Sequence, residues 1–122
     1  MSNFSKIKTV IKEILRKKAR RKKQITYTEL SQEVDRRTGE YIDPHSPILA
    51  RMLGEISTET YNLGQGMLSI LVIRKDNSSP GDGFFELAAE LGENISKKSP
   101  EDDKTKFEIE QFYQVCDFYK SK

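Results

Sequence analysis

A run of cationic side chains offers the clearest chemistry in this 122-residue chain, because seven of eight consecutive residues are Lys or Arg. The cations of the run are Arg16, Lys17, Lys18, Arg20, Arg21, Lys22 and Lys23. Residues 1–23 carry ten basic side chains and one acidic side chain, a net charge of +9, whereas the other 99 residues carry eleven basic and eighteen acidic side chains, a net charge of −7. Like charges repel unless a polyanion or solvent surrounds them, so a phosphate backbone is the first partner to consider. The two alternatives are a solvated helix end and a patch for an anionic membrane surface.

Residue types that support catalysis or metal binding are few. His45 is the only histidine, which excludes a two-histidine metal site and leaves an acid-base role without an obvious partner. Cys116 is the only cysteine, so neither an internal disulfide nor a thiolate metal cluster can form. The acids at 101–103 suit the first turn of a helix, and residues 80–83 lack the spacing and the lysine of a phosphate-binding loop. We therefore expect no catalytic residue, no metal and no cofactor.

Length and composition bound the kind of protein. At 122 residues the chain fits one domain, and its 35% hydrophobic and 33% charged content indicates a small core with long polar helix faces. No stretch approaches eighteen uninterrupted apolar residues, and no apolar segment with a cleavage site follows Met1. These features predict a cytoplasmic protein with no membrane span.

The apolar spacing predicts three helices in the first half of the chain. Phe4, Ile7, Val10, Ile11, Ile14 and Leu15 recur at intervals of three and four residues, which places a helix over residues 3–21. Thr26 and Glu29 form a capping-box pattern that begins a second helix, and Gly39 is a suitable end for it. Ser46 as cap and Pro47 as first residue begin a third helix, which ends near Gly64.

The second half predicts a hairpin and a last helix. The apolar run 67–73 reads as a buried strand, residues 76–83 as a loop, and Phe84 with Phe85 as an antiparallel return strand. Residues 86–91 form a short helical turn. We expect residues 1–92 to form the domain, residues 93–104 a polar linker and residues 105–122 a C-terminal amphipathic helix packed on the same domain, although Ser99 and Pro100 also carry helix-opening chemistry.

This order of elements, from about residue 3 to residue 87, resembles the winged helix-turn-helix superfamily. The resemblance implies an α+β fold with a small antiparallel hairpin, in which the third helix, residues 46–62, enters the DNA groove and the loop 76–83 touches the backbone. The residues that it adds as candidates for nucleic-acid binding are Arg51, Asn62, Arg74 and Lys75.

Residues 25–30, followed by a helix that contains Arg51 and Gly54, also resemble the DNA-binding half of alkylguanine alkyltransferases. Those enzymes need a Pro-Cys-His-Arg loop after the third helix, and this chain has Leu-Ser-Ile-Leu at 68–71, so alkyl transfer is not predicted. Residues 80–87 are similar to loops of small uncharacterised bacterial proteins.

We therefore interpret the chain as a non-catalytic DNA-binding accessory or regulatory protein, with double-stranded DNA as the expected partner. The alternative is a protein-protein adaptor or subunit that binds another protein, or a second copy, through an aromatic C-terminal helix. The aromatic residues of that helix are Phe107, Phe112, Tyr113, Phe118 and Tyr119.

Overall fold

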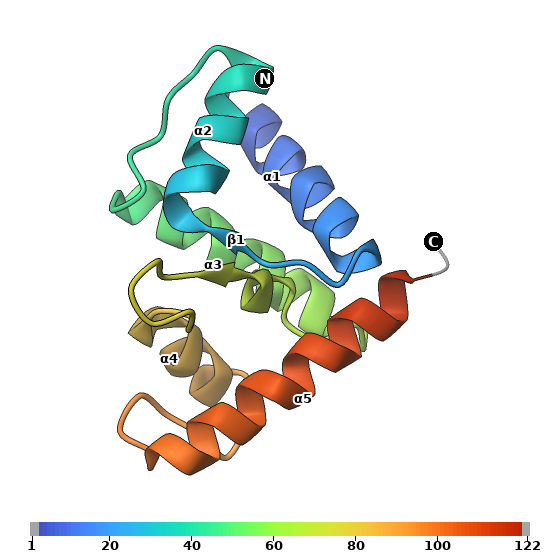
Figure 1. Ribbon diagram of the computed structural model, residues 1–122, viewed down its shortest axis with the longest axis vertical. Helices are drawn as coiled ribbons and strands as arrows, with labels where there is room; N and C mark the ends of the chain where they lie inside the picture. Colours follow the sequence, from blue (N-terminus) through green and yellow to red (C-terminus); the bar gives the residue numbers. More distant parts are fainter. Residues whose placement is uncertain (1–2, 121–122) are drawn as a thin grey trace.

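A computed structural model describes residues 3–120 as a mostly helical protein with one small sheet (Figure 1). The α-helices are α1 (Asn3–Arg20), α2 (Tyr27–Thr38), α3 (Pro47–Asn62), α4 (Asp82–Glu90) and α5 (Glu101–Tyr119). A 3-10 helix, η1 (Leu68–Leu71), leads into strand β2 (Val72–Ile73), which pairs with strand β1 (Ile25–Thr26). The α+β class expected from the sequence is thus confirmed at this coarse level.

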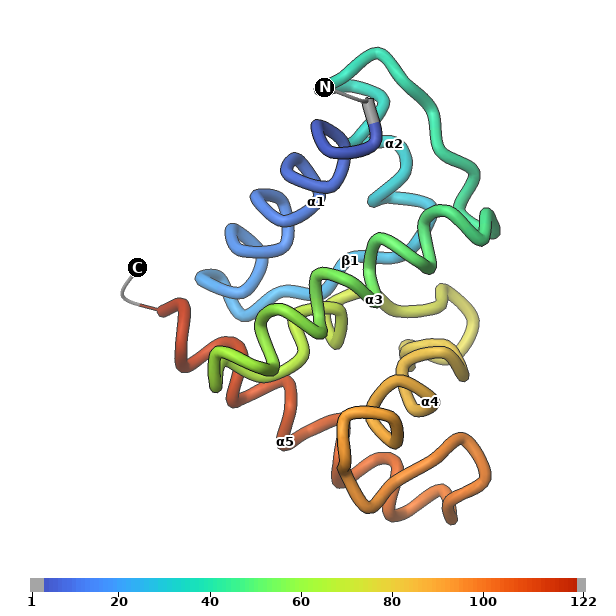
Figure 2. The backbone as a smooth tube through the Cα atoms, turned by 180° about the vertical axis from the view of Figure 1, so that it is seen from behind, coloured from blue at the N-terminus to red at the C-terminus, as the bar shows by residue number. Residues whose placement is uncertain are grey.

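The helices surround one short buried segment. In Figure 1, α1 and α2 lie side by side in the upper part and α5 crosses the lower part; the opposite view in Figure 2 brings α3 to the front. Helix α1 packs against α2, α3 and α5, and η1 contacts α1, α3 and α5. Helix α1 therefore packs against neighbouring helices on more than one of its sides.

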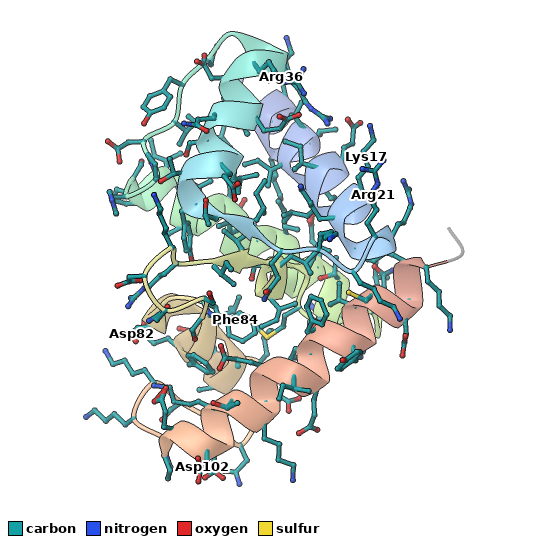
Figure 3. All side chains as sticks on the ribbon, viewed as in Figure 1. Lys17, Arg21, Arg36, Asp82, Phe84 and Asp102 are labelled. Atoms are coloured by element: carbon teal, nitrogen blue, oxygen red, sulfur yellow. The ribbon has the colours of Figure 1, made fainter. Side chains whose placement is uncertain are left out.

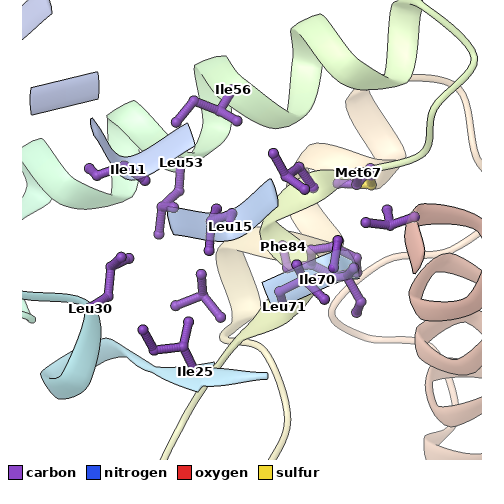
Figure 4. Close-up of a cluster of buried hydrophobic side chains, with 14 of the residues drawn as sticks. Ile11, Leu15, Ile25, Leu30, Leu53, Ile56, Met67, Ile70, Leu71 and Phe84 are labelled. Carbon is purple, nitrogen blue, oxygen red and sulfur yellow. The ribbon is translucent and has the colours of Figure 1, made fainter. Parts of the chain in front are cut away.

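The predicted apolar stripe of α1 enters the core. Ile7, Ile11, Ile14 and Leu15 are buried, while Phe4 and Val10 pack partly buried against the same cluster. Residues 67–72 are buried along their whole length, and Met67, Ile70 and Leu71 belong to the same apolar cluster as Leu15 and Ile56 (Figure 4). Burial of this continuous apolar surface is the main stabilising term of the fold.

The buried strand predicted for residues 67–73 is wrong over most of its length, because side chains replace the sheet. The amide N–H groups of Met67, Leu68 and Ser69 do not meet a neighbouring strand. They donate to Gln111 Oε1 (2.9 Å), Thr60 Oγ1 (3.2 Å) and Ser57 Oγ (2.8 Å), respectively. Polar side chains of α3 and α5 thus satisfy the buried backbone, which folds as η1.

The predicted antiparallel hairpin is also wrong. Strands β1 and β2 run parallel, with Ile25 opposite Val72 and Thr26 opposite Ile73. Phe84 and Phe85 lie in α4, where their rings meet edge to face at 5.3 Å between centroids and both are buried. A helix places both rings and Ala88 on the core side, whereas a two-residue strand would turn one ring to solvent.

Residues 91–100 form the loop that connects α4 to α5. Ile95 is buried, Lys97 Nζ lies 2.7 Å from Glu86 Oε1, and Ser96 N–H donates to Ser99 Oγ at 3.0 Å. Helix α5 begins at Glu101, inside the segment 93–104 that the sequence suggested as a linker. Within residues 3–120, no helix combines the length and the apolar content that a membrane crossing requires.

Candidate nucleic-acid interface

The C-terminal half of α1 and the outer side of α2 enclose a groove of about 570 Å³ in which cations outnumber acids. We call it the cationic groove; its charged residues are Lys17, Lys18, Arg21, Arg36 and Arg37 with Glu29 and Glu33. In Figure 3 the labelled Lys17, Arg21 and Arg36 lie along one side of the molecule, away from Asp82 and Asp102. Two consecutive helices thus contribute to one positive surface.

The capping box fixes where α2 begins and which side it presents. Thr26 N–H donates to Glu29 Oε1 at 2.9 Å, and Glu29 N–H donates to Thr26 Oγ1 at 3.1 Å, as the sequence predicted. Leu30 and Val34 then point into the core. Positions 29, 33, 36 and 37 consequently face the end of α1 rather than the interior.

The end of α1 is closed by two characteristic backbone bonds. Lys23 N–H donates to the Lys18 carbonyl at 2.9 Å and Lys22 N–H to the Ala19 carbonyl at 3.1 Å, the pattern of a Schellman motif. Lys22 takes the left-handed conformation, φ 54°, that usually belongs to glycine. The cationic run is therefore folded against its helix up to Lys23.

The run divides into three groups in space. Lys17, Lys18 and Arg21 line the cationic groove, and Arg16 is partly buried with no hydrogen-bond partner at its Nε. The remaining exposed cations, Arg20, Lys22 and Lys23, line no part of the groove. The charge of Lys22 acts to lower the pKa of the buried Cys116 thiol, against the larger effect of burial, which raises it. Because Cys116 belongs to α5, Lys22 lies on the side of α1 that faces α5.

The two acids of the groove are already engaged. Glu33 accepts from Arg37 Nε at 2.9 Å and from Arg36, and these hydrogen bonds lower the pKa of Glu33. The bonds of the capping box lower the pKa of Glu29. In the part of the chain that the structure describes, Lys17, Lys18 and Arg21 form no ion pair, so the five cations and two acids leave a net charge of +3.

A second hollow of about 670 Å³ adjoins the groove where α2 begins. Its walls come from the start of α2, the loop before α3, the residues after β2 and the start of α4. They include Arg74 and Lys75 together with Asp76 and Asp82, so the two cations of this hollow are balanced by two acids. Both Lys75 and Lys18 help to lower the pKa of Glu29, so both cations lie near this carboxylate.

Tyr27 and Gly81 shape the inner wall of this hollow. A Cβ added to Gly81 would lie 3.5 Å from Arg74 Nη2 and 3.6 Å from Tyr27 Oη, so backbone, guanidinium and phenol are in close contact. Burial raises the pKa of the Tyr27 phenol above its usual value, against smaller opposing effects of the Gly81 backbone and of Arg74. The wall combines an aromatic ring with a fixed positive charge.

Arg51 and Asn62, the two candidates on α3, line neither surface. The Arg51 guanidinium lies 5.8 Å from the centre of the Phe4 ring, and its Nε is 3.3 Å from Glu55 Oε2. Lys8 of α1 reaches both Glu55 and Glu59, each at 3.4 Å. The structure thus separates the predicted recognition helix from the cationic groove.

Sequence reasoning missed Arg36 and Arg37 as members of the interface. Both stand in the last turn of α2, where cations also complement the helix dipole. The sequence did indicate that these arginines form ion pairs on one helix face. Glu33 precedes them by three and four residues, which is the spacing at which side chains on a helix meet. Their distance from α1 depends on helix packing, which the spacing does not reveal.

Potentially reactive side chains are held in structural contacts. Ser69 lines a small pocket of about 120 Å³ beside Tyr27, where its Oγ accepts a hydrogen bond from Ser57 Oγ at 2.5 Å. Cys116 is buried, and desolvation raises the pKa of its thiol. Among residues 3–120, no three His, Cys, Asp or Glu side chains gather as a metal site would require.

What the arrangement offers is therefore one groove with an excess of positive charge, beside a second hollow in which cations and acids balance. No protein family, curated protein or solved structure matches this chain.

Proposed function

We propose that this chain is a non-catalytic DNA-binding domain, with an accessory or regulatory role, that holds a phosphate backbone of double-stranded DNA in the cationic groove. The observation that carries the proposal is the meeting of five Lys and Arg side chains from α1, the turn after it and α2 in one groove. Arginine presents several donors in a planar fork that matches phosphate oxygens, and lysine supplies a point charge. Arg74 and Lys75 lie in the neighbouring hollow, where Asp76 and Asp82 balance their charge.

The helical part of the winged-helix resemblance enters this proposal in a changed form. Helices α1, α2 and α3 follow in the expected order, but the hairpin is absent from residues 3–120 and Arg51 is held by Glu55. In the proposed complex, the cationic groove contacts the backbone, with Arg74 and Lys75 as the nearest further cations. Sequence-independent attraction then exceeds base readout. A cytoplasmic location is part of the same proposal.

The expected strength follows from counterion release. Each phosphate that a cation neutralises adds about −0.9 to the slope of log affinity against log salt on duplex DNA. The three groove cations without ion pairs predict a slope of about −3, and full engagement of all five predicts about −4.5. A fourfold increase in salt then lowers affinity by a factor of about forty or more.

The test is a salt series of duplex binding with matched variants. Lys17→Gln, Lys18→Gln and Arg21→Gln combined should reduce the slope toward zero, because these side chains carry most of the uncompensated charge. The control combines Lys6→Gln, Lys98→Gln and Lys106→Gln, which removes the same charge from exposed sites outside the groove. Equal slopes for both triple variants, with unchanged circular dichroism, would reject the groove as the binding site.

The adaptor alternative is favoured by one observation on α5. Phe107 and Phe112 pack against the core and Tyr119 is buried, so most of the predicted aromatic surface is internal. Tyr113 is the exception, with 54% of its surface exposed, and the aliphatic Ile109 one turn before it is 51% exposed. We propose a binding role for this part of α5 in addition to DNA binding.

A further inference from the structure

A groove of about 450 Å³ runs between α5 and the loop after β2, and it is separate from the cationic groove. Ile70 of η1 and Phe112 contribute apolar surface, and residues 77–79 form the opposite wall. Ser79 Oγ donates to Glu108 Oε1 at 2.5 Å, which ties the loop to α5. The groove therefore has a defined shape, because both of its walls are held in place.

Two exposed apolar side chains stand one helical turn apart beside this groove. Ile109 and Tyr113 both line it, and the Tyr113 ring is fixed edge to face on Phe112 with centroids 5.6 Å apart. The other large apolar side chains that are exposed among residues 3–120, Tyr41, Ile48 and Leu63, line none of the hollows described above. Adjacent exposed apolar groups on a rigid helix are typical of a protein-binding surface.

The charge of the groove selects the chemistry of its occupant. Glu101 and Glu108 line it, and no Lys or Arg of the described residues does. Helix α5 as a whole contains six acidic and two basic side chains. An apolar floor with an acidic border favours a segment that carries apolar residues on one face and cations around them.

We propose that the α5 groove docks a cationic amphipathic segment of a partner protein. Ile109 and Tyr113 contact the apolar face of that segment, and Glu101 and Glu108 attract its Lys and Arg side chains. The site lies outside the proposed DNA contact, so the DNA-binding proposal and this one can fail separately.

The test uses fluorescence anisotropy with a pool of labelled 15-residue peptides. Leu or Phe occupies positions spaced by three and four residues, and Lys or Arg fills most other positions. Wild-type protein should bind members of this pool, and Ile109→Ser with Tyr113→Ser should weaken that binding at least tenfold, as removal of anchoring side chains does. The double variant Glu101→Gln and Glu108→Gln should weaken it severalfold and flatten its salt dependence.

The controls separate this site from general stickiness. Leu63→Ser removes an even more exposed apolar side chain elsewhere and should leave binding unchanged, and a pool with Glu in place of Lys and Arg should not bind. Three outcomes overturn the proposal. They are absence of binding to the whole cationic pool, binding that survives both α5 double variants, and concentration-dependent dimerisation that Ile109→Ser abolishes, which would identify a second copy as the occupant.

Discussion

The two sides of α1 carry similar side chains but differ in electrostatics. On the side toward α2, Lys17, Lys18 and Arg21 face two further cations, and the acids there are fewer than the bases. On the side toward α3, Lys8 lies between Glu55 and Glu59 and is neutralised. The comparison teaches that a cation's role depends on which element packs beside it, and the sequence position alone does not determine this.

The same contrast applies to the helix that a winged-helix fold would use for recognition. Arg51 is its best-placed cation, yet Glu55 binds it and Phe4 covers one face of the guanidinium. The outer side of α3 carries two acids, Glu55 and Glu59. They lie beside Arg51 of the same helix and Lys8 of α1. A phosphate approaching this side would meet no net positive charge, so α3 is a poor backbone contact.

The largest expected effect comes from comparing a variant of the cationic groove with a variant of α3. Lys18→Glu with Arg21→Glu should lower duplex affinity about a hundredfold at 0.1 M salt, because two phosphate contacts are lost and become repulsive. Arg51→Gln should change affinity by less than twofold. Both are measured by anisotropy titration of one labelled duplex. If Arg51→Gln proved as damaging as the groove double variant, α3 would be the contact and the comparison would reverse.

A smaller effect concerns the cap that holds α2 beside the groove. Thr26→Ala removes the acceptor for Glu29 N–H and should destabilise the fold by about 1 kcal/mol. Thr28→Ala, an exposed residue of the same turn, should stay within about 0.5 kcal/mol. Urea denaturation at pH 7 measures both, and equal stability of the two variants would show that the cap contributes nothing.

At acidic pH, the difference in stability between the Thr26→Ala and Thr28→Ala variants should decrease. The cap bonds hold the pKa of Glu29 below its usual value, so their contribution is fully present above the unfolded pKa of about 4.3 and is lost as pH falls through the lower folded value. The destabilisation by Thr26→Ala should therefore decrease below about pH 4. A difference that grew on acidification would contradict the assigned direction of the Glu29 shift.

Local chemistry allowed much of the helical fold to be predicted. The Thr26 and Glu29 capping box, the left-handed Gly39 and the Ser46 and Pro47 helix start are all confirmed. Each depends on residues within a few positions of one another, so it is visible in the sequence.

The errors occurred where distant side chains decided the backbone. Residues 67–71 looked like a strand, since a short apolar run does not distinguish a buried strand from a buried turn. Gln111, far along the chain, takes one of the backbone bonds that a sheet would have made. Phe84 and Phe85 lie in a helix, and the Phe84 ring packs against Phe107 of α5 with 5.9 Å between centroids.

The candidate site shows the same division. The cations of α1 could be found by counting charges, and three of them line the cationic groove. The contribution of Arg36 and the neutralisation of α3 by Lys8 depend on how helices pack, with Lys8 and Glu59 separated by 51 positions in the chain. Charge content was therefore predictable, and charge pairing was not.

The smallest expected effect tests the neutral side of α1. Lys8→Gln removes both contacts to Glu55 and Glu59 and should cost about 0.5 kcal/mol of stability, the range of exposed ion pairs. Lys6→Gln, an exposed cation on the same helix, should cost less. Urea denaturation is the suitable measurement, because guanidinium would screen the charges, and 1 M NaCl should abolish the difference between the variants. If Lys8→Gln instead reduced DNA affinity as strongly as Lys18→Gln while stability stayed unchanged, Lys8 would belong to the binding surface, and the two sides of α1 would be electrostatically equivalent.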